Sequence, residues 1–377
     1  MSIVVPTLNE AGNLRELVER LDRTLGDRQY EILIVDDGSR DGTHDLCIEL
    51  QRSYPLRLLI RSEPTDGLSG AVLHGLARAH GEFLVVMDAD LQHAPEQVAD
   101  LLVPLVNGTA EFVLGSRYVP GGTTEDDWGL LRRANSKVAT LLARPFAGQT
   151  RDPMSGFFAL HRQTYERAGT LNPIGYKVAL ELICKCRVRQ VREVPIRFGL
   201  RGAGRSKLTL TQQVQYLDHL SRLYDYCFPR ASTWAKFLIV TGCAWFVAFG
   251  LYVRLVARDV SPVFAPTLAF AGAALATALF HRRSLRTRGR PTASPRDWLD
   301  FALVTLGEWS ICALAARWVA MHVLHLTVIQ FFAVTFGVVA VGRYALRARL
   351  TRNLNGIRFE PDRAVTAAAE PAMRQAA

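Results

Sequence analysis

The chain carries the stretch Phe83-Leu84-Val85-Val86-Met87-Asp88-Ala89-Asp90, an apolar run that ends in two carboxylates. A short, purely apolar run is typical of a buried strand. Side chains alternate faces along a strand, so Asp88, Asp90 and then Gln92 are expected to point toward one spot. Converging oxygen ligands suit a hard divalent cation such as Mg²⁺ or Mn²⁺, which completes its shell with substrate phosphates and water. A solvated acidic turn after a strand would show the same residues, so the rest of the chain decides between these interpretations.

Strand and helix patterns alternate on both sides of this stretch. Strands are predicted at residues 2–6, 30–35, 56–60, 83–87 and 112–114, and helices at residues 9–25, 41–51 and 68–80. This alternation predicts an α/β fold with a doubly wound, mostly parallel sheet. Ligands of such sheets bind outside the carboxyl ends of the strands. Polar clusters follow three of the predicted strands: Thr7-Leu8-Asn9-Glu10, Asp36-Asp37-Gly38-Ser39 and Asp88-Ala89-Asp90. Three clusters at the expected edge favour a binding site there.

The common glycine-rich nucleotide motifs are absent from the sequence. No Gly-x-Gly-x-x-Gly follows the first strand, and no Gly-x-x-x-x-Gly-Lys-Ser/Thr occurs, so a nucleotide would be held mainly by side chains and a metal. Asp37 is suited to accept a hydrogen bond from a base or a ribose hydroxyl. It is also suited to cap its own turn, but Asp36, Gly38 and Ser39 already supply that turn, which favours the binding interpretation.

Several motifs together resemble the inverting family 2 glycosyltransferases with a GT-A fold. Within that family they resemble dolichol-phosphate mannose synthases and related polyprenyl-phosphate glycosyltransferases, over about residues 2–230. The motifs are Val5-Pro6-Thr7-Leu8-Asn9-Glu10, Val35-Asp36-Asp37-Gly38-Ser39, Asp41-Gly42-Thr43, Gly67-Leu68-Ser69-Gly70-Ala71, Asp88-Ala89-Asp90-Leu91-Gln92-His93, Gly115-Ser116-Arg117-Tyr118, Asp152-Pro153-Met154-Ser155-Gly156-Phe157 and Arg201-x-x-Gly204-x-Ser206-Lys207. Leu8 departs from the pattern, because these synthases often carry Tyr there; the departure puts a base-stacking contact in doubt and leaves the predicted fold unchanged.

The resemblance implies a role for each motif residue. The nucleotide pocket is expected to involve Pro6, Glu10, Val35, Asp37, Asp88 and Lys207. The metal and the diphosphate would be held by Asp88, Asp90 and Gln92. The lipid phosphate or the sugar would face Arg117, Arg133, Ser136 and Arg201, and the catalytic residues would be Asp90, Arg117 and Arg201. The alternatives are a solvated helix face around Arg133 and a basic linker around Arg201 and Lys207.

The sequence favours an acceptor that is already anionic. No Ser-His-Asp or Cys-His pairing is recognisable, and the histidines are scattered, with only His93 next to the metal motif. A hydroxyl acceptor needs a general base. A phosphate monoester is largely a dianion at neutral pH and can attack without one. Arginines in these motifs would neutralise the donor and acceptor phosphates.

Charge and cysteine usage narrow the partners. The net charge of the 377 residues is +10, but no nucleic-acid recognition motif accompanies it. Much of the basic excess lies beside apolar segments, where anionic lipid headgroups are the natural partner. The six cysteines form no disulfide or metal pattern, and Cys184-x-Cys186 lacks a second pair, so reduced thiols are expected. No signal peptide is expected, because the first strand begins at once.

The last third of the chain predicts a membrane domain. Residues 208–230 fit an interfacial amphipathic helix. Four apolar segments, 234–256, 262–280, 301–324 and 327–346, approach or exceed the ~20 residues that span a bilayer. Arginine clusters after the second and fourth segments put both termini and the enzyme domain in the cytoplasm, in a multi-pass protein of the cell membrane. This part resembles the four-helix GtrA-like domain. Glu308 and Arg317, within the third segment, are interpreted as a helix–helix pairing or a lipid-carrier contact.

These observations predict a GT-A domain at residues 1–207, the interfacial helix at 208–230, an all-α four-span domain at 231–350 and a disordered tail at 351–377. The predicted activity is inverting transfer of a hexose, mannose from GDP-mannose, to a polyprenyl or dolichyl phosphate at the cytoplasmic membrane face, without nucleic acid. The alternatives are a UDP-glucose-dependent polyprenyl-phosphate glucosyltransferase and a lipid-carrier flippase with a nucleotide-sugar-sensing domain. A processive polysaccharide synthase is disfavoured, because the Gln-x-x-Arg-Trp motif of such enzymes is missing.

Overall fold

The computed structural model describes residues 1–62, 64–124, 130–148, 150–175, 177–199, 210–260 and 264–285, with seven single positions between 303 and 341. The chain divides into two compact units, Met1–Cys227 and Phe228–Ala377.

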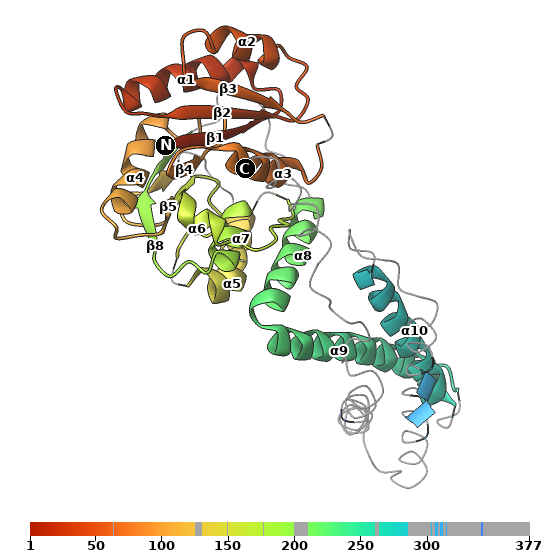
Figure 1. The fold of residues 1–377 in the computed structure, drawn as a ribbon. Helices are drawn as coiled ribbons and strands as arrows, with labels where there is room; N and C mark the ends of the chain where they lie inside the picture. Colours follow the sequence, from red (N-terminus) through yellow and green to blue (C-terminus); the bar gives the residue numbers. More distant parts are fainter. Residues whose placement is uncertain are drawn as a thin grey trace, which may run out of the picture. The chain divides into compact units, whose positions relative to one another are not determined.

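The first unit is built on a seven-stranded sheet (Figure 1). Its strands are β1 (Ser2–Thr7), β2 (Glu31–Asp36), β3 (Leu56–Ile60), β4 (Phe83–Val86), β5 (Phe112–Ser116), β7 (Phe158–His161) and β8 (Val191–Pro195), in the order β3-β2-β1-β4-β7-β5-β8. All neighbours pair in parallel except β7, which runs antiparallel to both β4 and β5. A two-stranded parallel sheet joins β6 (Thr123–Thr124) to β9 (Arg197–Phe198). The predicted α/β class and mostly parallel sheet are confirmed.

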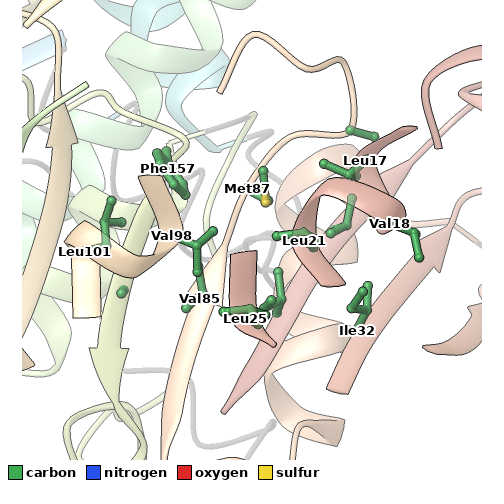
Figure 2. Close-up of a cluster of buried hydrophobic side chains, with 14 of the residues drawn as sticks. Leu17, Val18, Leu21, Leu25, Ile32, Val85, Met87, Val98, Leu101 and Phe157 are labelled. Carbon is green, nitrogen blue, oxygen red and sulfur yellow. The ribbon is translucent and has the colours of Figure 1, made fainter. Parts of the chain in front are cut away.

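Helices lie on both faces of this sheet, as a doubly wound fold requires. The helices of the first unit are α1 (Ala11–Leu25), α2 (Thr43–Leu50), α3 (Gly67–Arg78), α4 (Val98–Val106), α5 (Leu130–Ala147), α6 (Arg162–Glu166), α7 (Val178–Lys185) and α8 (Leu210–Cys227), and η1 (Pro95–Gln97) is a short 3₁₀ turn. Leu17 and Leu21 of α1 pack with Val85, Met87 and Phe157 in one buried cluster (Figure 2). Burying this apolar surface against the sheet is the main stabilising contribution.

The opposite face is covered by α3 and α7. Leu76 and Leu182 share a second buried cluster with Val4 and Val35 of the sheet. Gly75 allows α3 to lie close to the strands, because a Cβ there would stand 2.4 Å from Val4 Cγ1. Strand residues therefore alternate between the two clusters, which fixes the register of β1 and β2.

Helix α8 belongs to the first unit and packs on α5 and α7. Leu220 and Leu223 are buried in a cluster with Leu180 of α7. The Tyr216 hydroxyl donates to the Ala139 carbonyl at 2.8 Å. A buried carboxylate, Glu181, binds the ammonium of Lys185 at 2.7 Å and His219 Nε2 at 2.8 Å. The other side of α8 exposes apolar surface, with Val214 and Leu217 each 54% exposed.

The second unit contains two long helices in its described part, α9 (Pro229–Val256) and α10 (Ala265–Leu285), which pack against each other. Among the described residues, α9 alone is long and apolar enough to cross a membrane, judged by length and composition. It exposes Ile239 and Phe246 by 62% and 68%. The second predicted segment is helical, but its apolar helix, Thr267–Thr277, is shorter. Apart from the seven single positions, the predicted third and fourth segments lie outside the described residues, as do Glu308, Arg317 and the tail.

Candidate active site

The Asp88-Ala89-Asp90 motif lies at the carboxyl end of β4, but not within the strand. β4 ends at Val86, and Leu91 has a φ of 59°, in the left-handed region. Asp88, Asp90 and Gln92 are therefore not brought together by the alternation of side chains along a strand, and the expectation that they are was wrong. A tight turn does so instead: the Gln92 N–H donates to Asp90 Oδ1 at 3.2 Å, as in an Asx-turn. The two carboxylates differ in exposure, since the Asp88 side chain is 38% exposed and Asp90 is 7% exposed.

Gln92 is held by two hydrogen bonds to Gly199, just before the segment that contains Arg201. Its Nε2 donates to the Gly199 carbonyl at 3.2 Å, and the Gly199 N–H donates to the Gln92 carbonyl at 2.9 Å. The first bond uses the donor end of the amide, and the opposite end is the one that a cation would take.

His93 is buried beside this turn. Its ring stacks on Phe157 at 5.1 Å between centroids and meets Phe198 edge-on at 5.2 Å. Its Nδ1 lies 3.8 Å from Asp88 Oδ2. Burial lowers the pKa of His93 to about 4, although the charge of Asp90 acts in the opposite direction. The imidazole is therefore neutral at physiological pH and is held mainly by aromatic packing.

Arg117, at the end of β5, is held by Asp152. Its Nε lies 2.7 Å from Asp152 Oδ2 and its Nη2 lies 2.9 Å from Asp152 Oδ1, a bidentate pair. The guanidinium also lies over the Phe198 ring at 5.1 Å. Burial alone would lower the pKa of Arg117, but the hydrogen bonds and charge of Asp152 raise it above the ordinary value. Arg117 is thus a permanently charged group with a fixed orientation.

The segment from Asp152 to Gly156 joins this arginine to the metal motif. Gly156 lies against Asp88, because a Cβ on Gly156 would stand 3.2 Å from Asp88 Oδ2. Lys177 Nζ donates to the Met154 carbonyl in the same segment at 3.1 Å. Burial, reinforced by the charge of Arg117, lowers the pKa of Lys177 to about 7, while Asp152 and Asp88 act against that shift. Asp88, Arg117 and Lys177 therefore surround one loop.

In the polar cluster at the end of β2, the neighbouring carboxylates of Asp36 and Asp37 have different partners. Asp36 Oδ1 accepts from the Gly38 N–H at 2.9 Å and from the Ser39 N–H at 2.8 Å, so Asp36 makes the turn. Asp37 pairs instead with Arg61, with Nη1 and Oδ1 3.1 Å apart. Burial raises the pKa of Asp37, and the charge of Arg61 opposes that rise. The division of roles predicted from the sequence holds for Asp36.

The other predicted nucleotide residues lie at the ends of β1 and β2. Glu10 is half-buried, and its Oε2 accepts from Asn13 Nδ2 at 2.8 Å. Pro6 is buried, and Val35 is 0% exposed with its side chain in the cluster under α3. Only the main chain of Val35 can therefore line a pocket.

Part of the predicted set lies beyond what the structure describes. Arg133 and Ser136 lie in α5, but their side chains are not described, and Arg201 and Lys207 lie outside the described residues. Sequence reasoning gave no role to Arg61, Asp152, Gly156 or Lys177. The motif around Asp152 was visible in the sequence, whereas Arg61 and Lys177 carry no local signal.

The oxygen donors of Asp88, Asp90 and Gln92 suit a hard metal cation. Within the described ranges, no group of three or more His, Cys, Asp or Glu side chains could hold a metal by itself. Two carboxylates and an amide, all oxygen donors, remain at the Asp88–Gln92 turn. This set fits a hard cation that binds together with substrate phosphates and water, as Mg²⁺ commonly does.

Comparisons with known proteins identify a family and several relatives of this chain. Residues 2–169 match the family Glycosyl transferase family 2. The chain is 42% identical over 226 residues to a dolichol-phosphate mannosyltransferase of Pyrococcus furiosus, covering 59% of this chain and 63% of that protein. It is 39% identical to a dolichol-phosphate mannosyltransferase of Saccharomyces cerevisiae, covering 60% and 88%. A solved glucosyl-3-phosphoglycerate synthase from Mycobacterium tuberculosis, in complex with Mn²⁺, UDP and glucosyl-3-phosphoglycerate, aligns with a TM-score of 0.46 at 21% identity, covering 60% and 79%.

The chain belongs to glycosyl transferase family 2. Within that family, its homologues include the dolichol-phosphate mannosyltransferases. It spans less than two thirds of the length of the Pyrococcus protein.

Proposed function

We propose that the protein transfers mannose from GDP-mannose to a polyprenyl or dolichyl phosphate with inversion at the anomeric carbon. One arrangement carries the proposal: the Asp88–Asp90 turn lies against the loop that holds Arg117 and Lys177. Two phosphate-bearing substrates must approach each other in this reaction. A cation site beside two half-buried positive side chains supplies the neutralisation that such an approach needs. The relatives' names support the same acceptor class.

The cation, Mg²⁺ or Mn²⁺, would be held by Asp88, Asp90 and Gln92. When bound, it neutralises the donor diphosphate and stabilises the leaving nucleoside diphosphate. Asp90 is the better fixed of the two carboxylates, because it is buried and accepts the Gln92 N–H. Asp88 is more exposed and lies against Gly156.

Donor binding is assigned to the ends of β1 and β2. Asp37, with Arg61 behind it, would accept a hydrogen bond from the base or ribose. Glu10 and the main chain at Pro6 and Val35 complete this side, and Lys207 is assigned to the diphosphate. Arg117, with Arg133, Ser136 and Arg201, is assigned to the acceptor phosphate and the sugar.

The acceptor phosphate acts as the nucleophile without a protein base. One of its oxygens forms the new bond to the anomeric carbon while the bond from that carbon to the nucleoside diphosphate breaks. His93 is unsuited to be a base, since its ring is stacked on Phe157 and buried. Asp152 is also unsuited, because both of its carboxylate oxygens bind Arg117. A phosphate dianion needs neither.

We further propose attachment to the cell membrane through four spans, with the catalytic unit and both termini in the cytoplasm. Among the described residues, this proposal is supported by α9, whose length and composition suffice to cross a bilayer. The exposed apolar residues Val214 and Leu217 support an interfacial position for α8.

A donor panel tests the function. Purified protein is incubated with Mn²⁺, a short polyprenyl phosphate and either GDP-mannose, UDP-glucose or UDP-galactose. We expect a glycolipid from GDP-mannose, with kcat/KM at least about tenfold above that of the other donors. Preference for UDP-glucose would establish the glucosyltransferase alternative instead. Nucleotide-sugar binding with no product from any donor would support the flippase alternative and overturn the proposal.

A further inference from the structure

Two cysteines from distant parts of the first unit meet between α7 and α8. Cys184 lies in α7 and Cys227 ends α8, and their Sγ atoms are 2.8 Å apart although the residues stand 43 positions apart in the sequence. Both are free thiols. A disulfide needs an S–S distance of about 2.05 Å, so only a small movement separates these atoms from a bond.

The surroundings of the two thiols differ. Cys184 is 8% exposed, whereas Cys227 is half-buried. The hydrogen bond with Cys184 lowers the pKa of Cys227 against the opposing effect of burial, and the charge of Lys185 adds to the lowering. The same hydrogen bond, together with burial, raises the pKa of Cys184. Since the thiolate is the reactive form, Cys227 is the member that reacts first.

The other two cysteines of the first unit offer no such pair. Cys47 and Cys186 are each 0% exposed, and burial raises their pKa values to about 12 and about 11. Cys186 stands only two positions from Cys184, yet α7 directs it into the cluster beneath α3. Cys186 is therefore an internal control: it is close to Cys184 in the sequence but does not share its surroundings in the structure.

We propose that Cys184 and Cys227 form an intramolecular disulfide that clamps the end of α8 to α7. Low-molecular-weight disulfides such as oxidised glutathione serve as the oxidant. The Cys227 thiolate attacks one sulfur of the small disulfide and releases one small thiolate. Cys184 then loses its proton to solvent, attacks the Cys227 sulfur and releases the second small thiol. The protein loses two electrons, and the small disulfide gains them.

The clamp has a structural consequence. The loop that it closes contains β8, β9, the segment with Arg201 and Lys207, and all of α8. Closing a loop of this length restricts the unfolded chain, and for a unit of this size the midpoint of thermal unfolding should rise by on the order of 10 °C.

Peptide mapping tests the proposal. Purified full-length protein is equilibrated with oxidised glutathione, its remaining thiols are alkylated under denaturing conditions, and it is digested without reductant. We expect mass spectrometry to find a linked Cys184–Cys227 peptide, with Cys47 and Cys186 alkylated. We also expect the unfolding midpoint to rise, and the rise to vanish with dithiothreitol. Absence of the linked peptide, or equal linkage through Cys186, would overturn the proposal.

Single variants test the order of events. Cys184→Ser should stop at a glutathione adduct on Cys227, whereas Cys227→Ser should leave Cys184 alkylatable and unmodified. Cys186→Ala should still form the linked peptide and serves as the matched control. An adduct on Cys184 in Cys227→Ser, at the same rate as on Cys227 in Cys184→Ser, would contradict the assigned nucleophile. The wild-type map decides whether the disulfide forms, whatever the folding of the variants.

Discussion

Arg117 donates two hydrogen bonds to the carboxylate of Asp152, from Nε at 2.7 Å and from Nη2 at 2.9 Å. This bidentate pair connects the end of β5 to the loop beside the metal motif. Arg117 was predicted to face a phosphate. The structure shows that a protein carboxylate already orients it, so any phosphate would meet a guanidinium held in place.

Replacing Asp152 by Asn should be strongly destabilising. The Asp152 side chain is 1% exposed and that of Arg117 is 14% exposed, so the change leaves a buried charge without its counter-charge. We expect a loss of about 3–5 kcal/mol in the free energy of unfolding. Glu49→Gln, which breaks the solvent-exposed pair with Arg15, should reduce the free energy of unfolding far less. Urea unfolding of both variants gives the comparison, and equal losses would mean that the Arg117–Asp152 pair contributes little.

Gly156→Ala should weaken cation binding without unfolding the protein. The added methyl would stand 3.2 Å from Asp88 Oδ2 and would push that carboxylate out of place by a few tenths of an ångström. We expect the Mn²⁺ concentration for half-maximal activity to rise about tenfold, with an unchanged unfolding midpoint. Gly12→Ala is the control, because nothing lies within 4 Å of a Cβ there. An unchanged Mn²⁺ dependence in Gly156→Ala would argue against Asp88 as a ligand.

Lys177 should set an alkaline limit on activity. Its lowered pKa of about 7 means that the ammonium is charged below that pH and loses its charge above it. The acceptor phosphate loses its dianion form below its second pKa of about 6. The pH profile of kcat/KM, which reports the free enzyme and substrate, should therefore fall on both sides of this window. Lys177→Arg keeps the charge and should remove the alkaline limb, whereas a limb that survives in Lys177→Arg would assign it to another group.

A fragment ending at Cys227 should keep the catalytic unit. The first compact unit ends there, and α8 is anchored in it by Leu220 and Leu223. We expect the fragment to bind GDP-mannose like the full chain and to retain activity on short acceptors. Its kcat/KM on long polyprenyl phosphates should fall by about tenfold or more in a bilayer assay. If the fragment and the full chain were equally fast on long polyprenyl phosphates, the second unit would have no part in transfer.

The sequence predicted strands β1 to β5 and helices α1, α2 and α3, with ends within two residues of those in the structure, because alternating apolar runs report burial directly. It missed η1 and α4, which lie between β4 and β5. It did not predict β7, since Phe158-Ala159-Leu160 is short and hydrophobicity says nothing about strand direction. The turn role of Asp36 could be predicted because Asx-turn chemistry is local. The contacts of Arg61 and Lys177 depend on how distant segments pack, which a local pattern does not encode. The Asp88–Gln92 prediction used the wrong geometry, because β4 ends at Val86.

The central claim is cation-dependent transfer through the Asp88–Asp90 turn, and Asp90→Asn tests it most directly. The amide keeps the shape of the buried side chain, so the unfolding midpoint should change by only a few degrees. The measurement is transfer of labelled mannose from GDP-mannose to a short polyprenyl phosphate in Mn²⁺, with and without EDTA. We predict a loss of at least about a hundredfold in kcat for Asp90→Asn, and no product from the wild-type protein in EDTA. Full activity of the wild-type protein in EDTA, or of a folded Asp90→Asn variant in Mn²⁺, would contradict the account.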